Sequence, residues 1–81
     1  MTDHVVVRFY AAAREVIGKS ELEIAPSRLD AIITLLSAGV AQKERVFSQC
    51  SFLIDGEICH DITREIRAGQ IIDVLPPFAG G

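Results

Sequence analysis

Apolar residues recur at every second position in two early segments, and this alternation predicts two β-strands. In residues 5–10, Val5, Val7 and Phe9 share one face, which is expected to turn inward. Residues 21–24 repeat the pattern with glutamates between the apolar positions, which predicts a second strand with a solvated outer face.

Later in the chain, the pattern predicts a hairpin and a final strand. Apolar runs at 52–54 and 57–59 flank Asp55-Gly56, a dipeptide that favours a hairpin because both turn positions need a positive φ. Residues 71–75 form an apolar run typical of a buried strand, and Pro76-Pro77 ends it because proline cannot donate to the ladder.

Helical patterns lie between these strands. Residues 11–17 are rich in alanine and predict a short helix that ends at Gly18. A single long amphipathic helix is predicted next, with Ser27 as a possible N-cap, Gly39 as its stop, and apolar positions at Leu29, Ile32, Ile33 and Leu36. Residues 41–48 follow neither period, so another helical turn and an irregular connection both stay open.

The connection 61–70 is polar, and we expect Ile62 and Ile66 to hold it against the core, with a tight bend at Ala68-Gly69. The predicted order is strand, strand, helix, hairpin, strand, which is an α+β fold. Since crossover connections are right-handed, the economical topology places the last strand parallel to the first at the sheet centre. That arrangement is the ubiquitin-like β-grasp, with residues 1–75 as the domain and 76–81 as an extended tail.

Composition narrows the classes of function. The 81 residues are 49% hydrophobic and 23% charged, which suits one domain with its own core. The net charge of −3 argues against a nucleic-acid partner, and the apolar runs are far shorter than the roughly 20 residues of a membrane span. The N-terminal segment has no signal-peptide pattern, so we expect a cytoplasmic protein. Cys50 and Cys59 are not spaced like metal ligands, so we expect reduced thiols and no bound metal.

Catalytic motifs are missing, since the chain contains neither a glycine-rich phosphate loop nor a zinc-binding H-E-x-x-H sequence. His60 beside Asp61 could pass a proton, but a solvated strand end is the favoured interpretation. Cys50 and Cys59 are expected to fill the core rather than to react. We therefore expect a protein that is not itself an enzyme and binds no cofactor.

The C-terminal segment is the candidate for chemistry. Pro76-Pro77 stiffens the exit from the last strand, and Gly80 and Gly81 lack a Cβ, so they can enter a narrow channel. Residues 76–81 span about 20 Å when extended, enough to place the Gly81 carboxylate inside another protein. A carboxylate with a reference pKa of roughly 3.5 is a poor electrophile until it is activated, for example by joining to AMP. A frayed end is the competing interpretation.

Four motifs resemble the MoaD-like sulfur carriers, the small subunits of molybdopterin synthase. They are Phe9-Tyr10-Ala11-Ala12-Ala13-Arg14-Glu15, Asp55-Gly56-Glu57, Ala68-Gly69-Gln70 and the segment from Leu75 to Gly81. The resemblance implies that Gly81 is adenylated by an ATP-using adenylyltransferase similar to ubiquitin-activating enzymes, and that a sulfur donor protein then supplies a thiocarboxylate. It also implies that the tail (Pro76, Pro77, Phe78, Ala79, Gly80) enters the large synthase subunit, where the sulfur passes to a cyclic pterin precursor.

The same resemblance implies that Arg14, Ile58 and Leu75 contact the partner, whereas a solvated arginine and core packing are the competing interpretations. Phe78 stands where the family often has a smaller aliphatic residue, and Asp55 where Asn is common. A carrier of the same fold for thiazole synthesis or tRNA thiolation, or a ubiquitin-like modifier, is an alternative. So is a β-grasp binding module whose tail has no chemical role.

Overall fold

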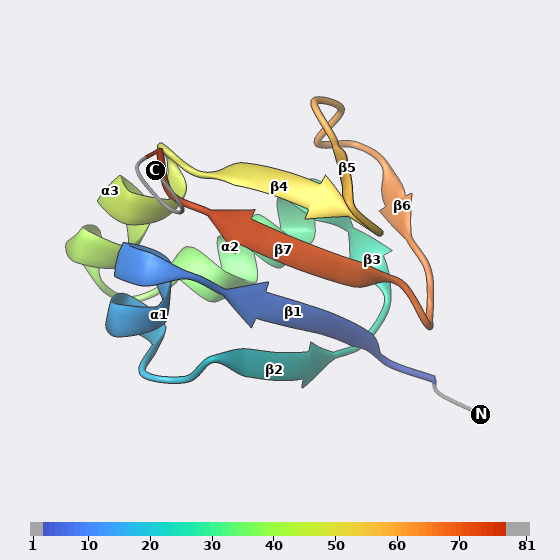
Figure 1. Ribbon diagram of the computed structural model, residues 1–81, viewed down its shortest axis with the longest axis horizontal. Coiled ribbons are helices and arrows are strands. Elements are labelled where there is room, and N and C mark those ends of the chain that lie inside the picture. The colour runs from blue at the N-terminus through green and yellow to red at the C-terminus, as the bar shows by residue number, and fades with distance from the viewer. Residues whose placement is uncertain (1–2, 78–81) are drawn as a thin grey trace.

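The computed structural model describes residues 3–77, and its central feature is a mixed sheet with strand order β2-β1-β7-β4-β5 (Figure 1). β1 and β7 are parallel neighbours at the centre, and the other pairs are antiparallel. The strands are β1 (Val5–Phe9), β2 (Glu21–Ile24), β4 (Ser51–Ile54), β5 (Glu57–Ile58) and β7 (Ile71–Leu75). The α+β fold and the ubiquitin-like β-grasp topology predicted from the sequence are thereby confirmed.

Helices cover one face of this sheet; in Figure 1, α2 lies behind the strands, and α1 and α3 lie at their left end. They are α1 (Ala11–Ile17), α2 (Leu29–Ser37) and α3 (Ala41–Phe47). The core fills the space between the layers and consists of Val5, Val7, Phe9, Ala13, Leu29, Ile32, Leu36, Phe47, Phe52, Ile54, Ile66, Ile72 and Val74. Burial of this apolar surface is the main force that holds the layers together.

Three short helices share the cover: α1 lies at the predicted residues 11–17, and α2 is the amphipathic helix predicted between Ser27 and Gly39, although it does not cover the face alone. α2 has only nine residues, and the segment at 41–48 that the sequence left open is the helix α3. Phe47 explains why this segment folds back: its ring is 2% exposed and meets Phe9 edge to face, with centroids 6.3 Å apart. Most of the charged residues of α3 face solvent, so the segment has no visible amphipathic period.

The N-terminus of α2 is capped by backbone from a distant loop. Ser27 is not the N-cap, since it lies in β3 (Ser27–Arg28), which pairs with β6 (Glu65–Ile66). The Leu29 N–H donates to the Arg64 carbonyl at 2.9 Å, and the Asp30 N–H donates to the Ile62 carbonyl at 2.7 Å. These bonds satisfy donors that a helix start leaves unpaired.

Ile62 therefore anchors the connection through its carbonyl and not through its side chain, which is 51% exposed. The expectation that this side chain packs into the core is wrong, whereas Ile66, 1% exposed, is in the core as predicted. The loop therefore contacts the N-terminus of α2 through backbone at residues 62 and 64, and it enters the core only at Ile66 in the short strand β6.

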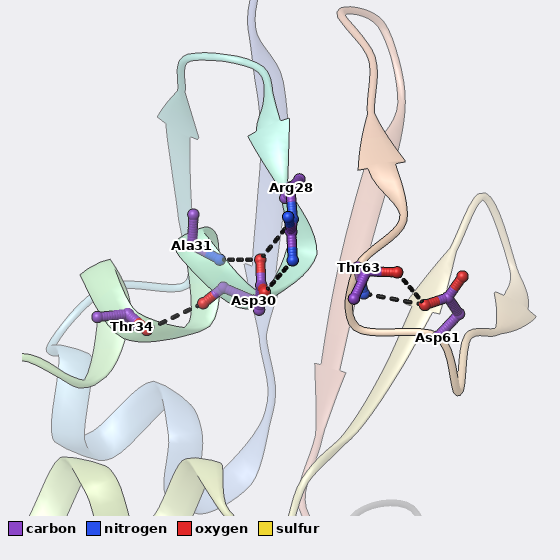
Figure 2. Close-up of polar contacts among 6 residues, drawn as sticks. All are labelled: Arg28, Asp30, Ala31, Thr34, Asp61 and Thr63. Carbon is purple, nitrogen blue, oxygen red and sulfur yellow. Dashed lines mark hydrogen bonds and ion pairs between the residues drawn. The ribbon is translucent and has the colours of Figure 1, made fainter.

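A turn at Asp61 holds this capping loop in shape (Figure 2). The Asp61 carboxylate accepts hydrogen bonds from the Thr63 N–H at 3.0 Å and from the Thr63 hydroxyl at 2.6 Å. These two bonds lower the pKa of Asp61 below its ordinary value of 3.8, and the bond from the Thr63 hydroxyl has the larger effect.

At the start of α2, the Asp30 carboxylate forms an ion pair with Arg28 at 2.6 Å and accepts a hydrogen bond from the Ala31 N–H at 2.8 Å (Figure 2).

Asp61→Ala is expected to lower the thermal midpoint at pH 7, because the turn that presents the Ile62 and Arg64 carbonyls to α2 loses its hydrogen bonds. The folded-state pKa of Asp61 is depressed, so its ionised form stabilises the fold above pH 3.8, and this contribution is lost as the pH falls through the folded pKa. Melting curves by circular dichroism from pH 7 downward should therefore show the two proteins converging in acid.

Glu57→Gln is the matched control for Asp61→Ala, because the Glu57 side chain is exposed and forms no hydrogen bond or ion pair with another described residue, while its backbone pairing with Ile54 is retained. We expect its melting curve to follow that of the wild type across the same pH range. A gap between Asp61→Ala and wild type that stays constant down to the lowest pH would contradict the role of the ionised carboxylate.

Both predicted turns are present. At the β4–β5 hairpin, Asp55 and Gly56 have φ values of 51° and 86°, as the Asp-Gly sequence requires. The Asp55 carboxylate also accepts from the Ile71 N–H at 2.9 Å, which ties the hairpin to the start of β7. The bend before β7 has Gly69 at φ 90°, and the Gln70 N–H donates to the Arg67 carbonyl at 3.1 Å.

Within residues 3–77, no helix combines the length and the hydropathy needed to cross a bilayer. The same residues contain no cluster of three or more His, Cys, Asp or Glu side chains arranged to hold a metal ion.

Candidate functional site

The sheet face that the helices leave uncovered carries a group of apolar side chains. Residues paired across a sheet point to the same side, and those on this face alternate with the buried ones. Ile58 pairs with Leu53, which pairs with Asp73 on β7, and Asp73 in turn pairs with Arg8 on β1. We call the apolar members of this face the outer patch: Val6, Leu53, Ile58, Ile71 and Leu75.

An ion pair lies at the centre of the outer face. The Arg8 guanidinium donates to both carboxylate oxygens of Asp73, at 2.7 and 3.1 Å, and the Tyr10 hydroxyl donates to one of them at 3.1 Å. The Asp73 side chain is only 13% exposed, so these three bonds compensate for the loss of its hydration. The outer patch therefore surrounds a fixed polar centre rather than forming one apolar surface.

The electrostatics of the cluster follow from this geometry. The hydrogen bond and the charge of Asp73 raise the pKa of Arg8 above its already high value. Burial, and then the hydrogen bond to Asp73, raise the pKa of Tyr10 above its ordinary value of 10.0. Both donors are therefore protonated at neutral pH, and the cluster acts as a rigid anchor and not as a proton-transfer site. The sequence analysis missed it.

The chain leaves the sheet at the end of β7, whose last residue, Leu75, lies on the outer face. Leu75 is half-buried and pairs with Ser51, while the Tyr10 N–H donates to the Val74 carbonyl at 3.3 Å just before β7 ends. Pro76 is half-buried and Pro77 is exposed. The predicted tail residues Phe78, Ala79, Gly80 and Gly81 lie outside the described residues, and their roles stay predictions.

The three predicted partner contacts lie at different places around this face. Ile58 is 54% exposed at the β5 edge, so core packing does not explain it. Leu75 lies on the same face, at the end of β7. Arg14 is exposed on α1 and lines a shallow hollow of about 190 Å³ together with Arg8 and Tyr10, which places it beside the central ion pair.

The cysteines fill space next to the core, as predicted. The Cys50 thiol donates to the Val46 carbonyl at 3.2 Å, and burial raises its pKa to about 11, so it is protonated and unreactive at neutral pH. The Cys59 thiol donates to the Asp61 carbonyl at 3.4 Å. His60 is exposed, in agreement with a solvated strand end.

Comparison with known proteins gives one family and several similar structures. The model of the ThiS family matches residues 7–81. Small archaeal modifier protein 1 from Methanosarcina acetivorans superposes with a TM-score of 0.79 at 19% identity, over 100% of this chain and 99% of that one. The complex of subunits 1 and 2 of molybdopterin-converting factor from Helicobacter pylori 26695 gives 0.71 at 19% identity, over 96% and 99%.

Urm1 from Trypanosoma brucei gives a TM-score of 0.74 at 12% identity, over 99% of this chain and 97% of that one. The sequence matches no curated protein. At these identities, the structural similarity establishes a shared fold alone, whereas the family match rests on the sequence from Val7 to Gly81.

Proposed function

The chain belongs to the ThiS family of ubiquitin-like β-grasp proteins, and on that premise we propose that it is a sulfur carrier whose reactive group is the Gly81 carboxylate. The observation that carries the proposal is the family match, which includes Gly80-Gly81 as well as the domain. Glycine suits this role because the carbonyl carbon has no branched neighbour to hinder attack.

The chemistry requires two steps on that carboxylate. An activating enzyme joins a Gly81 oxygen to the α-phosphate of ATP, which releases pyrophosphate and leaves an acyl adenylate. The terminal sulfur of a donor-protein persulfide then attacks the carbonyl carbon and displaces AMP, which forms an acyl disulfide. A second thiol cleaves this S–S bond by forming a disulfide with the donor cysteine, so that the chain ends in a thiocarboxylate. The carrier supplies no catalytic group in this scheme; ATP is used by the activating enzyme.

We further propose that the sulfur goes to the cyclic precursor of molybdopterin, inside a large synthase subunit. The support is the FYAAARE motif, which contains Arg14, together with Pro76-Pro77 before the tail. The structure of the similar chain from Helicobacter pylori is that of a complex with a second subunit. In our proposal, such a subunit docks on the outer patch and Arg14, receives the tail and performs the catalysis. We propose the cytoplasm as the place of this reaction.

Protein modification is the second candidate, and the similarity to small archaeal modifier protein 1 favours it. Both functions begin with the acyl adenylate and differ in the final acceptor. A lysine amine on a target protein gives an isopeptide bond at Gly81, whereas the pterin precursor takes only sulfur. An isopeptide-linked protein as the product would therefore indicate the modifier function, and a sulfur-containing pterin the carrier function.

Intact mass spectrometry tests the proposal. The chain is incubated with its activating enzyme, ATP and a sulfur donor, and exchange of one oxygen for sulfur should add about 16 Da at Gly81. The thiocarboxylated chain, mixed with the large subunit and precursor, should return to its original mass as the product forms. No mass gain with any activating enzyme of the source cell would overturn the carrier function, and isopeptide-linked proteins without pterin product would assign the modifier function.

A further inference from the structure

A second surface lies at the other side of the molecule from the hairpin, where β2 forms the edge of the sheet. In Figure 1, β2 runs along the lower edge, and no strand of the described chain pairs with its outer side. This edge is about as far from β5 as the sheet allows, because three strands separate the two.

The edge of β2 offers free backbone hydrogen-bonding groups. The Phe9 N–H donates to the Ser20 carbonyl at 2.9 Å, and Leu22 and Ile24 pair with Val7 and Val5 in the same register. In an antiparallel ladder, alternate residues direct their N–H and C=O groups to the partner strand, and the residues between direct theirs away from it. The backbone groups of Glu21 and Glu23 therefore point to the open side.

An apolar groove runs beside this edge on the helix-bearing face. It has a volume of about 240 Å³ and is lined by Ile17, Leu22, Ile24 and Leu35, among others. Leu35 is 63% exposed, which makes it the most exposed large apolar side chain of the described residues. We call this the edge groove. An apolar groove next to free strand groups fits a peptide that binds by strand addition.

Two lysines lie on the rim of the edge groove. Lys19 precedes β2, and Lys43 belongs to α3. Neither forms an ion pair with another described residue. The groove therefore carries local positive charge on a chain whose net charge is −3, and the opposite side of β2 carries the exposed carboxylates of Glu21 and Glu23.

We propose that the edge groove binds an extended segment of a partner protein, which adds as a strand to β2. The alternation of side chains fixes the chemistry of that segment. Its residues opposite Leu22 and Ile24 are apolar and enter the groove, and those opposite Glu21 and Glu23 are basic. Acidic residues follow at the end next to the two lysines.

A second copy of this chain does not fit the same edge. Two β2 strands paired antiparallel through their open sides would bring the glutamates of one copy opposite those of the other. Like charges directly opposite each other destabilise a strand pair. The charges of β2 therefore favour a basic-apolar partner strand over self-association. The proposal does not rest on the sulfur-carrier function, because it involves neither the outer patch nor the tail.

A fluorescein-labelled peptide, Val-Lys-Val-Arg-Val-Asp-Asp, is the probe for this inference. Fluorescence anisotropy with the full chain should show saturable binding, and its charge-reversed counterpart Val-Glu-Val-Glu-Val-Lys-Lys should bind on the order of tenfold more weakly. In ¹⁵N spectra, the amides of Glu21 and Glu23 should shift most. No saturable binding, equal binding of both peptides, or shifts confined to the outer patch would overturn the proposal.

Variants locate the binding site. Leu35→Asp places a charge in the groove at a highly exposed position, and Lys19→Glu with Lys43→Glu reverses the rim; each protein should lose about tenfold in affinity for the probe. Ile58→Asp, on the outer patch, is the control and should bind the peptide as the wild type does. Sedimentation that shows a dimer abolished by Leu35→Asp would overturn the proposal in favour of self-association.

Discussion

Removal of Gly80 and Gly81 is expected to abolish thiocarboxylate formation completely and to leave the domain folded. The cut lies beyond β7, so every strand and helix of the described chain is retained, and the thermal midpoint should stay within about 1 °C of the wild type. The new terminus, Ala79, is shorter by two residues, or about 7 Å of reach, which withdraws the carboxylate from the activating site. Mass spectrometry after incubation with the activating enzyme, ATP and sulfur donor measures the loss.

A chain extended by one alanine after Gly81 is a second test of this prediction. It keeps both glycines and adds no charge, but it moves the carboxylate one residue further and gives it a Cβ neighbour. We expect it to fail in activation like the deletion. If either protein still gains sulfur at its own last residue, or restores function in cells without being trimmed, the assignment of chemistry to Gly81 is wrong.

Ile58→Asp is expected to weaken binding of the proposed large subunit by about 30-fold or more, equivalent to about 2 kcal/mol for loss of an apolar contact that is buried in the complex. The side chain is 54% exposed in the isolated chain, so the change should cost little stability. A charge on the outer patch would have to be buried without a partner in the complex. Isothermal titration calorimetry with the purified large subunit gives the affinity.

Val40→Asp is the matched control for Ile58→Asp. Val40 is 50% exposed and precedes α3, in the helical layer behind the sheet, so it introduces the same charge at a similar exposure away from the outer patch. We expect wild-type affinity for the large subunit. Equal weakening by both variants would mean that net charge, and not the outer patch, controls the association.

The strands were predictable because their signals are local. Val5, Val7 and Phe9 alternate within one strand, and Asp55-Gly56 contains both positive φ values that its turn needs. Even the parallel pairing of β1 with β7 followed from element order and the handedness of crossovers. These predictions rest either on patterns within a few residues or on general rules for how strands are connected.

Features that depend on individual contacts between residues far apart in the sequence were not predictable. α3 is held by Phe47 against Phe9, a contact between residues nearly forty positions apart, while its own sequence has no helical period. Ile62 caps a helix through its carbonyl, and a carbonyl is present at every residue, so the sequence carries no sign of it. The expected core contact of its side chain was a reasonable interpretation of an apolar residue and was wrong.

In the candidate site, too, the sequence pointed to single residues but not to the contacts between distant ones. Ile58 is exposed and Leu75 lies on the same face of the sheet, and their contact with a partner stays a prediction. The bonds from Arg8 and Tyr10 to Asp73 were missed, because they join residues 65 and 63 positions apart. An aspartate inside an otherwise apolar last strand was the one available signal for this cluster.

The place of β7 between β1 and β4 has a consequence for how the protein is made. During synthesis the ribosome releases β1 and β4 before β7, and until β7 arrives neither has its central neighbour. The nascent chain therefore cannot close its sheet until β7 has emerged, and such long-range pairing makes folding slow relative to a helical domain of this size. An enzyme that recognises the finished sheet would consequently ignore incomplete chains.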